Sequence, residues 1–259
     1  MQQTSALYRR LLADENHFFE TRVVIGEGGD LITEQGEKIL FGGYAIVVSR
    51  TGPDSGFPEN YVFSCETHSK MLDNKPEIGK CIAQEIDVKM LNPSGDMPRM
   101  SIVIPYVRVC TAEEQSEWLQ QGVFYIDTRE ITHNDDGLDI LTFHGYDAML
   151  RANQPLYESQ MDWPAADIDV VREIAAAMDV AVDSRTVEIM TAGYPISYPG
   201  SYSMIEVLGF LASMYLGSFI ITETGELRLV TLTEMPKETR YLIDQIGDTI
   251  TFGGDRILV

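Results

Sequence analysis

The stretch Gly122-Val123-Phe124-Tyr125-Ile126-Asp127-Thr128-Arg129-Glu130-Ile131-Thr132-His133 has the clearest alternation in the chain, and after Asn134-Asp135-Asp136-Gly137 it continues as Leu138-Asp139-Ile140-Leu141-Thr142-Phe143-His144-Gly145-Tyr146-Asp147. A period of two is typical of a half-buried strand. It places Val123, Tyr125, Asp127 and Arg129 on one face and Phe124, Ile126, Thr128 and Glu130 on the other. The Asn-Asp-Asp-Gly segment favours a chain reversal. The stretch therefore predicts a long β-hairpin, without an evident catalytic arrangement.

Before this hairpin the sequence predicts one short helix and several strands. Thr4 or Ser5 can cap a helix over residues 6–13. Further strands are expected over residues 19–25, 39–49, 61–65, 82–90 and 102–109. Gly42-Gly43 suggests a bulge or a close backbone approach in the second of these. Pro105 interrupts the last, and because proline has no N–H, it indicates an edge or bulge position.

After the hairpin the pattern changes to helices. Asp167 can cap a helix that runs to about Met178, and residues 180–189 suggest a short extended segment. Gly193-Tyr194-Pro195 and Tyr198-Pro199-Gly200 indicate a loop. Ser201 or Ser203 can then cap a helix over residues 204–216, with a hairpin over residues 218–230 behind it.

These patterns predict an α+β protein that is mainly β. Residues 1–150 form a β domain, a barrel or a sandwich by pattern. Residues 151–232 form a small α+β unit, and residues 233–259 are too short for another domain and are expected to return to the first one. With 259 residues, 44% of them hydrophobic, the chain has enough material for a substantial core.

The charge balance argues against two classes of partner. The chain has 40 acidic and 19 basic residues, a net charge of −21. This excess repels nucleic-acid phosphates and anionic membranes, so neither specific nucleic-acid binding nor membrane binding is expected. Three widely spaced cysteines predict reduced thiols rather than a disulfide framework. The first residues lack the pattern of a signal peptide, and no apolar run is long enough to span a membrane.

No catalytic, metal-binding or cofactor-binding residues are expected. One cluster in the hairpin, His133, Asp135, Asp136, Asp139 and His144, has side chains that suit a divalent ion, but a solvated turn with surface histidines explains it better. Gly26–Asp30 is rich in glycine but lacks the sequence of a phosphate-binding loop. Trp118, Trp163 and the twelve tyrosines could stack on sugars or bases, whereas core and interface roles are more common for such residues.

Several pieces of the sequence together resemble the tail hub proteins of bacteriophages and phage-like particles, chiefly those of Gram-positive prophages. The pieces are Ile78–Ile86 with Leu91-Asn92-Pro93, Pro98-Arg99-Met100 with Pro105–Val109, Ser116–Leu119 with Gly122–Asp127, Leu141–Leu150, Leu208–Ala212 and Gly217–Leu227. The resemblance extends over roughly residues 5 to 235.

The resemblance implies a tail-tube-like β-barrel hub domain with an inserted α+β domain, no enzymatic activity and a homotrimeric ring at the tail tip or baseplate. Its partners would be tail tube, spike or fibre proteins, in a phage or a contractile injection system assembled in the host cytoplasm. The residues that we expect to form the barrel and interface signature are Pro105, Tyr106, Trp118, Gly122, Tyr125, Asp127, Gly145, Tyr146 and Asp147.

Two alternatives to the hub remain open at this point. The chain could be the N-terminal anchoring module of a tail-associated peptidoglycan hydrolase, because many relatives of such hubs continue into a much longer C-terminal region, some with peptidoglycan-cleaving activity. Because this chain ends at Val259, we expect any lytic activity to lie elsewhere. The second alternative is a carbohydrate-binding tail-tip protein, which the tryptophan and tyrosine content motivates.

Overall fold

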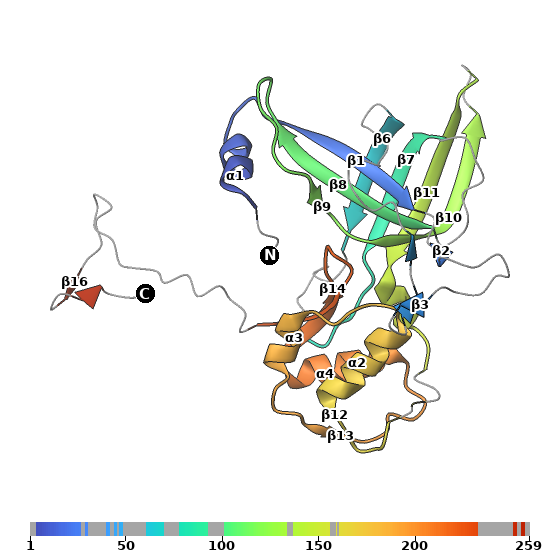
Figure 1. Cartoon of the computed structure of the whole chain (residues 1–259), viewed down its shortest axis with the longest axis vertical. Helices are drawn as coiled ribbons and strands as arrows, with labels where there is room; N and C mark the ends of the chain where they lie inside the picture. Colours follow the sequence, from blue (N-terminus) through green and yellow to red (C-terminus); the bar gives the residue numbers. More distant parts are fainter. Residues whose placement is uncertain are drawn as a thin grey trace.

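The computed structural model of the chain describes residues 4–26, 29–30, 40–41, 44–45, 47–48, 61–69, 78–92, 101–133, 137–155, 159, 161–232, 251–252 and 255–256. Within these residues, one large antiparallel sheet lies above a smaller unit of helices and a hairpin (Figure 1). The predicted α+β, mainly β class is confirmed. The predicted domain boundaries after residues 150 and 232 stay predictions.

The large sheet has the strand order β1-β8-β10-β11-β7-β6, and β9 pairs with β8 off this path. Its strands are β1 (Phe18–Gly26), β6 (Val62–His68), β7 (Glu85–Leu91), β8 (Ile102–Cys110), β9 (Leu119–Gln120), β10 (Phe124–His133) and β11 (Asp139–Asp147). The sheet curls until its two edge strands, β1 and β6, approach each other. No ladder joins these two strands among the described residues, so the sheet is an open barrel rather than a closed one.

The inside of the curl is an apolar core to which both edge strands contribute. Its buried residues are Val23, Ile86, Val88, Met90, Val103, Phe124, Ile126, Leu141 and Phe143. Partly buried Val62 and Cys65 of β6 pack against them. The alternation of buried and exposed residues along β7 and β11 matches the pleat of strands with one dry face.

The β10–β11 hairpin is confirmed, but its two faces do not follow the sequence alternation throughout. The register pairs Ile126 with Gly145 and then Thr128 with His144, which leaves Asp127 as the extra residue of a β-bulge. An extra residue reverses the face of every residue after it. The predicted faces are therefore correct up to Ile126 and wrong from Thr128 onward.

Pro105 lies inside the sheet, at the point where β8 changes partners. One side of β8 pairs with β1 along the whole strand, whereas its other side pairs first with β10 and then with β9, at Tyr106 and Val107. The carbonyl of Pro105 accepts the N–H of Gln121 at 2.8 Å. Because the N–H and C=O of a strand residue point to the same side, the missing N–H falls where one ladder ends and the next begins. The predicted edge position is wrong, because β8 has ladder partners on both sides, and the β1–β8 register shows no bulge at Pro105.

The expected single strand over residues 39–49 is wrong. The chain instead forms β3 (Leu40–Phe41), which pairs with β4 (Tyr44–Ala45), and β5 (Val47–Val48), which pairs with β2 (Gly29–Asp30). The chain therefore reverses between Phe41 and Tyr44. Gly42 and Gly43 lie outside the described residues. The strand-like end of the chain contains one more short pair, β16 (Thr251–Phe252) with β17 (Asp255–Arg256).

The first helix, α1 (Ala6–Leu12), begins after Ser5, the second of the two predicted caps. The Ser5 hydroxyl accepts the N–H of Tyr8 at 2.9 Å, as an N-cap does. Ser5 also donates to the Glu117 carboxylate twice, through its N–H at 2.8 Å and its hydroxyl at 2.6 Å. Leu11 is the buried residue of the helix. These contacts hold α1 against the loop between β8 and β9.

The smaller unit combines short helices with a hairpin. Its elements are η4 (Ala148–Ala152), β12 (Ala165–Ala166), α2 (Asp167–Ala177), α3 (Ser184–Ile189), β13 (Pro195–Ile196), α4 (Met204–Met214), β14 (Gly217–Ile221) and β15 (Leu227–Thr231). A second core fills the space between α2, α4 and the β14–β15 hairpin. Cys81 and Ala83, from the segment that leads into β7, belong to this core, and the N–H of Gly79 donates to the carbonyl of Gly217 at 2.7 Å.

Two helix predictions in this unit are wrong. Residues 184–189 form helix α3 rather than an extended segment, because the Asp183 carboxylate caps the N–H of Arg185 at 2.9 Å. Asp167 is the first residue of α2 rather than its N-cap, which is Ala166. The Asp167 side chain is fully buried and accepts a hydrogen bond from the hydroxyl of Tyr215. Asp167 therefore joins α2 to the end of α4.

Helix α4 begins after Ser203, one of the two N-cap residues that the sequence predicts. Ser203 is the N-cap, and it forms a capping box with Glu206, whose carboxylate accepts the N–H of Ser203 at 2.8 Å. Leu208 and Ala212 of this helix are fully buried. The helix therefore presents an apolar face to the second core.

Candidate functional site

Asp147 lies where the large sheet meets the α+β unit, as the last residue of β11 and the N-cap of η4. Its carboxylate accepts two backbone N–H groups, that of Gln84 on Oδ2 at 3.0 Å and that of Met149 on Oδ1 at 2.9 Å. In the other direction, the N–H of Asp147 donates to the carbonyl of Gln84 at 3.0 Å. The side chain therefore fixes the segment that leads into β7 against the first turn of the α+β unit.

The protonation of Asp147 is unusual for an aspartate. Burial raises the pKa of its carboxyl from 3.8 to about 7, and the N–H groups of Gln84 and Met149 offset only part of that rise. A carboxyl group that titrates near neutral pH therefore lies at the contact between the two units.

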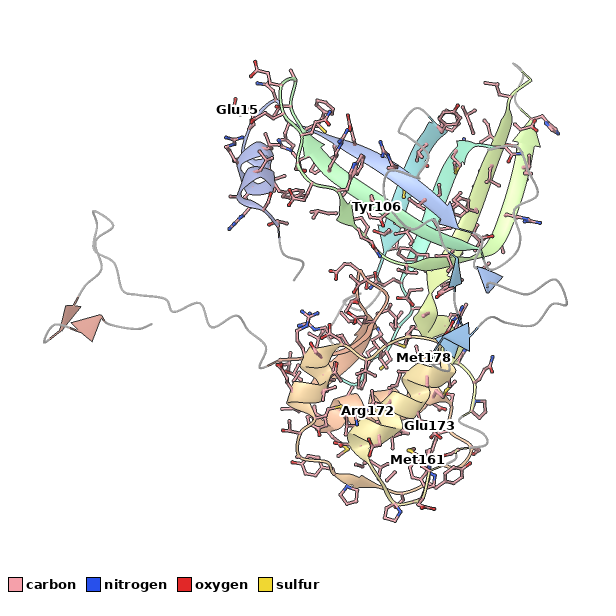
Figure 2. All side chains as sticks on the ribbon, viewed as in Figure 1. Glu15, Tyr106, Met161, Arg172, Glu173 and Met178 are labelled. Atoms are coloured by element: carbon pink, nitrogen blue, oxygen red, sulfur yellow. The ribbon has the colours of Figure 1, made fainter. Side chains whose placement is uncertain are left out.

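Two long side chains extend this contact into the α+β unit. The Gln84 amide donates to the carbonyl of Ile221 in β14 at 3.1 Å. The Arg151 guanidinium lies over the ring of Tyr125, 4.1 Å from its centroid, and donates to the carbonyl of Met178 at 2.9 Å. Met178 is at the end of α2 nearest the sheet (Figure 2). These contacts join the lead-in of β7 and strand β10 to α2 and β14.

We call Gln84, Tyr125, Asp147 and Arg151 the junction residues. Their contacts run mostly to backbone groups, and the Arg151 guanidinium also lies 3.6 Å from the carboxylate of Asp179. These contacts give hydrogen-bond partners to polar groups at the contact between the two units, and they fix the position of one unit against the other. We therefore assign the junction a positioning role.

Gly145 and Tyr146 pack the base of the β10–β11 hairpin. A Cβ atom on Gly145 would lie 2.6 Å from the carbonyl oxygen of Tyr125 and 3.2 Å from Cγ2 of Ile86, so a side chain does not fit without a backbone shift. Tyr146 pairs with Tyr125 across the hairpin, and its ring meets the ring of His144 edge to face at 4.8 Å. The close approach explains a glycine in mid-strand.

The ring of Trp118 contacts two arginines, Arg22 of β1 and Arg108 of β8. The guanidinium carbons of Arg22 and Arg108 are 4.6 Å and 4.4 Å from the centroid of its ring. Arg108 also pairs with Glu20 at 2.5 Å, and both side chains of this pair are about one-fifth exposed. Trp118 therefore covers cationic side chains of β1 and β8 instead of filling an apolar core alone.

Three other residues of the predicted signature, Tyr106, Gly122 and Asp127, lie in or between strands β8 and β10. The hydroxyl of Tyr106, a residue labelled on the large sheet in Figure 2, donates to Gln120 at 3.4 Å. A Cβ atom on Gly122 would lie 2.4 Å from the ring of Phe124. Asp127 forms the bulge of β10 and is exposed.

The structure brings only some of the predicted signature residues together. Tyr125, Gly145, Tyr146 and Asp147 meet at the base of the hairpin, whereas Pro105, Tyr106 and Trp118 lie around β8 and β9. The interface role that we predict for the nine residues stays a prediction. Sequence reasoning missed Gln84 and Arg151, because their partners are distant in sequence and no local pattern marks them.

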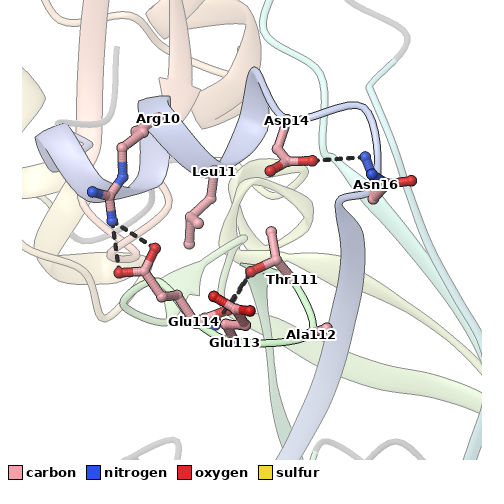
Figure 3. A pocket seen from close by; sticks show the side chains of 8 residues that line it. All are labelled: Arg10, Leu11, Asp14, Asn16, Thr111, Ala112, Glu113 and Glu114. Carbon is pink, nitrogen blue, oxygen red and sulfur yellow. Dashed lines mark hydrogen bonds and ion pairs between the residues drawn. The ribbon is translucent and has the colours of Figure 1, made fainter.

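One cavity lies between α1 and the loop after β8, with a volume of about 490 Å³. Figure 3 shows Arg10 of α1 reaching the carboxylate of Glu114, at 2.8 Å and 2.7 Å from its two oxygens, beside the buried Leu11. A second cavity of about 400 Å³ lies against β7, β10 and β11, where Asp87 and His144 contribute to its lining. In each cavity two lining side chains already bond to each other, Arg10 with Glu114 in the first and His144 with Asp87 in the second.

The histidines of the hairpin do not converge. His133 and Asp139 lie 2.5 Å apart across the turn, whereas the ring of His144 bonds to a residue of β7. Asp135 and Asp136 lie outside the described residues. In the part of the chain that the structure describes, no group of three or more histidine, cysteine or acidic side chains is placed to hold a metal ion. None of the described helices is long and apolar enough to cross a membrane.

Comparison with known proteins gives matches among solved structures. No known protein family matches the sequence, and no curated protein matches it. The 43 kDa tail protein of prophage MuSo2 from Shewanella oneidensis matches with a TM-score of 0.47 and 12% identity, over 91% of this chain and 61% of that one. A tail protein from Neisseria meningitidis MC58 matches with a TM-score of 0.42 and 10% identity, over 90% of this chain and 53% of that one.

A prophage tail protein, gp18 from Listeria monocytogenes EGD-e, is also similar, with a TM-score of 0.35 and 9% identity, over 82% of this chain and 50% of that one. The chain spans about three-fifths of the first of these proteins and about half of the other two. The Gram-positive detail of the sequence resemblance stays a prediction. Two of these three solved structures are named as prophage tail proteins and the third as a tail protein.

Proposed function

We propose that the chain is a structural hub of a phage or phage-like tail tip, forming a ring that connects the tail tube to distal spike or fibre proteins. The observation that carries this proposal is the open sheet. Its edge strands β1 and β6 have no ladder between them among the described residues, and β10 has β11 as its only described ladder partner from Thr128 to His133. Strand edges of this kind are places where another chain can pair.

Side chains on these edges also favour a partner. Phe63 of β6 is 55% exposed and Ile131 of β10 is 47% exposed. Apolar residues beside an unpaired strand edge promote uncontrolled association, unless a defined neighbour covers them. In a closed ring, each copy makes the same contact with both of its neighbours, so every exposed strand edge is covered by another copy.

The sequence resemblance supports the finer parts of the proposal. It covers the strands around β7, β8 and β10–β11 and the helix and hairpin of the α+β unit. On this view residues 1–150 are the barrel hub domain, residues 151–232 are the inserted domain and residues 233–259 return towards the barrel. A net charge of −21 would also let DNA pass the ring without adsorbing to it.

The mass of the purified chain in solution tests the ring. We expect light scattering coupled to size exclusion to give three times the chain mass of 29.0 kDa. Ile131→Asp should shift the mass towards the monomer, because it puts a charge beside the edge of β10. Thr142→Asp, at an exposed position of the partner strand β11, is the matched control and should leave the mass unchanged.

Two outcomes would contradict the hub. A monomeric mass over a wide range of concentrations would remove the ring. Release of soluble fragments from peptidoglycan by the purified chain would favour the alternative of a hydrolase anchor and remove the purely structural role.

A further inference from the structure

One loop of the α+β unit has a composition unlike the rest of the chain. From Ile189 to Ile205 the sequence has no charged residue, although charged residues make up 23% of the whole chain. Within this segment Tyr194, Tyr198 and Tyr202 recur at every fourth position, and the first two are each followed by proline. We call residues 193–202 the tyrosine loop.

Each tyrosine of the loop is held by a second aromatic ring from a different element. The ring-centroid distances are 6.1 Å for Tyr194 with Tyr215, 5.4 Å for Tyr198 with Trp163 and 5.2 Å for Tyr202 with Phe210. These distances, with tilted or edge-to-face rings, are those of favourable aromatic pairs. The pairs fix the orientation of the three rings before any partner arrives.

The same rings remain available at the surface. Tyr194, Tyr198 and Tyr202 are 50%, 47% and 51% exposed, and none of their hydroxyls hydrogen-bonds to another residue in the described part of the chain. The loop includes β13, which with β12 forms the end of the α+β unit farthest from the large sheet (Figure 1). It therefore lies away from the junction residues and from the sheet edges.

We propose that the tyrosine loop is a binding site for an uncharged oligosaccharide. A sugar ring has an apolar face of C–H groups, which packs on an exposed aromatic ring, and a rim of hydroxyls, which bonds to phenol and serine hydroxyls. Tyrosine, serine and glycine, which dominate the loop, combine flat contact area with adaptable hydrogen bonding at low entropic cost.

The charge of the loop selects among possible partners. A net charge of −21 repels polyanions, including phosphorylated or carboxylated glycans. A neutral, hydroxyl-rich ligand suits a loop without charges on a chain that is strongly acidic overall. The site does not depend on the proposed ring, because every residue of the loop and its partner rings lies within one chain.

The test uses the full chain on an array of neutral and anionic glycans, followed by titration with the neutral oligosaccharide that gives the strongest signal. Tryptophan fluorescence reports the titration, because the ring of Trp163 contacts Tyr198, whereas the other tryptophan, Trp118, contacts arginines of the large sheet. We expect saturable binding of a neutral glycan with a change in emission.

Substitutions then locate the site. Tyr198→Ala and Tyr202→Ala should each weaken binding by about tenfold, the order expected for one lost aromatic contact. Tyr198→Phe keeps the ring and should weaken binding less, which separates stacking from loss of folding. Leu12→Ala, which removes an exposed apolar side chain from α1, is the control and should bind normally.

The inference would be overturned by an array on which no neutral glycan binds, or on which anionic glycans alone bind. Neutral binding that survives both alanine substitutions would also overturn it. A monomeric chain that still binds a neutral oligosaccharide through the loop would contradict the hub and leave this inference intact.

Discussion

Gln84 and Asp147, 63 residues apart, bond to each other in both directions. The N–H of Asp147 donates to the carbonyl of Gln84, and the N–H of Gln84 donates to the carboxylate of Asp147, both at 3.0 Å. The backbone bond resembles an ordinary ladder bond, but the second bond depends on a side chain. Its loss can therefore be measured by substitution.

Asp147→Ala should lower the free energy of unfolding by about 2–4 kcal/mol, because it leaves the N–H groups of Gln84 and Met149 buried without an acceptor. Asp147→Asn keeps one acceptor oxygen and should cost less. Urea denaturation at pH 7 measures both variants. Equal and negligible losses would mean that water replaces the carboxylate and that the side chain does not fix the junction.

The same residue should give the protein a distinct pH dependence. Because burial raises the pKa of Asp147 from 3.8 to about 7, the folded state holds this proton more tightly than the unfolded state. The stability contributed by Asp147 is therefore fully present below about pH 4 and is lost as the pH rises to about 7. Unfolding of the native protein and of Asp147→Asn across this range measures the effect. As the pH rises from about 4 to about 7, the native protein should lose stability relative to the Asn variant. Stability curves that stay parallel over this range would contradict the raised pKa of Asp147.

Gly145→Ala should destabilise the hairpin by about 1–3 kcal/mol, because the added Cβ would lie 2.6 Å from a backbone oxygen that has little freedom to move. Thr142→Ala, at an exposed position on the same strand, should stay within about 0.5 kcal/mol of the native protein. Thermal unfolding followed by circular dichroism compares the two. A Gly145 variant as stable as the control would show that β10 and β11 can separate at this point.

Two ion pairs of different burial should differ in strength. Arg108 and Glu20 are about one-fifth exposed, whereas the Arg10 and Glu114 side chains are 63% and 51% exposed. Double-mutant cycles to alanine should give a coupling of about 1–3 kcal/mol for the first pair and at most about 0.5 kcal/mol for the second. Raising the salt concentration should weaken the second more strongly. The reverse order would mean that desolvation cancels the attraction between Arg108 and Glu20.

Ser203→Ala should cost about 1 kcal/mol, because its hydroxyl accepts the N–H of Glu206 at the start of α4. Ser201→Ala is the control, since this exposed serine is the alternative cap suggested by the sequence and lies outside the capping box. Chemical denaturation gives the free energy of unfolding of both variants, and only Ser203→Ala should lower it. Equal effects would imply that tertiary packing alone sets the start of the helix.

Local patterns in the sequence were sufficient to locate most of the described strands and three of the described helices, α1, α2 and α4. The alternation around Phe124 and Ile126 reflects a strand with one buried face, and Ser203 precedes its helix as caps do. Sequence patterns failed where a single residue changes the local structure. The bulge at Asp127 inserts a residue without a sequence signal, and Asp183 starts a helix too short to show a period.

The contacts that define the junction could not be predicted from local patterns. Asp147 looks like an ordinary strand-end acid, and its burial depends on Gln84 from a segment far away in sequence. Arg151 could have been assigned to the surface by its charge, whereas its guanidinium covers Tyr125. Such pairs become visible only when the order of strands in the sheet is known.

The backbone contact between Gly79 and Gly217, together with Cys81 and Ala83 in the second core, means that the α+β unit does not fold from its own residues alone. A fragment limited to residues 151–232 would lack part of its interior, and a chain shortened by that region would expose the apolar segment before β7. The two parts cannot be exchanged independently between proteins: any graft that moves one must also carry the matching lead-in from the other.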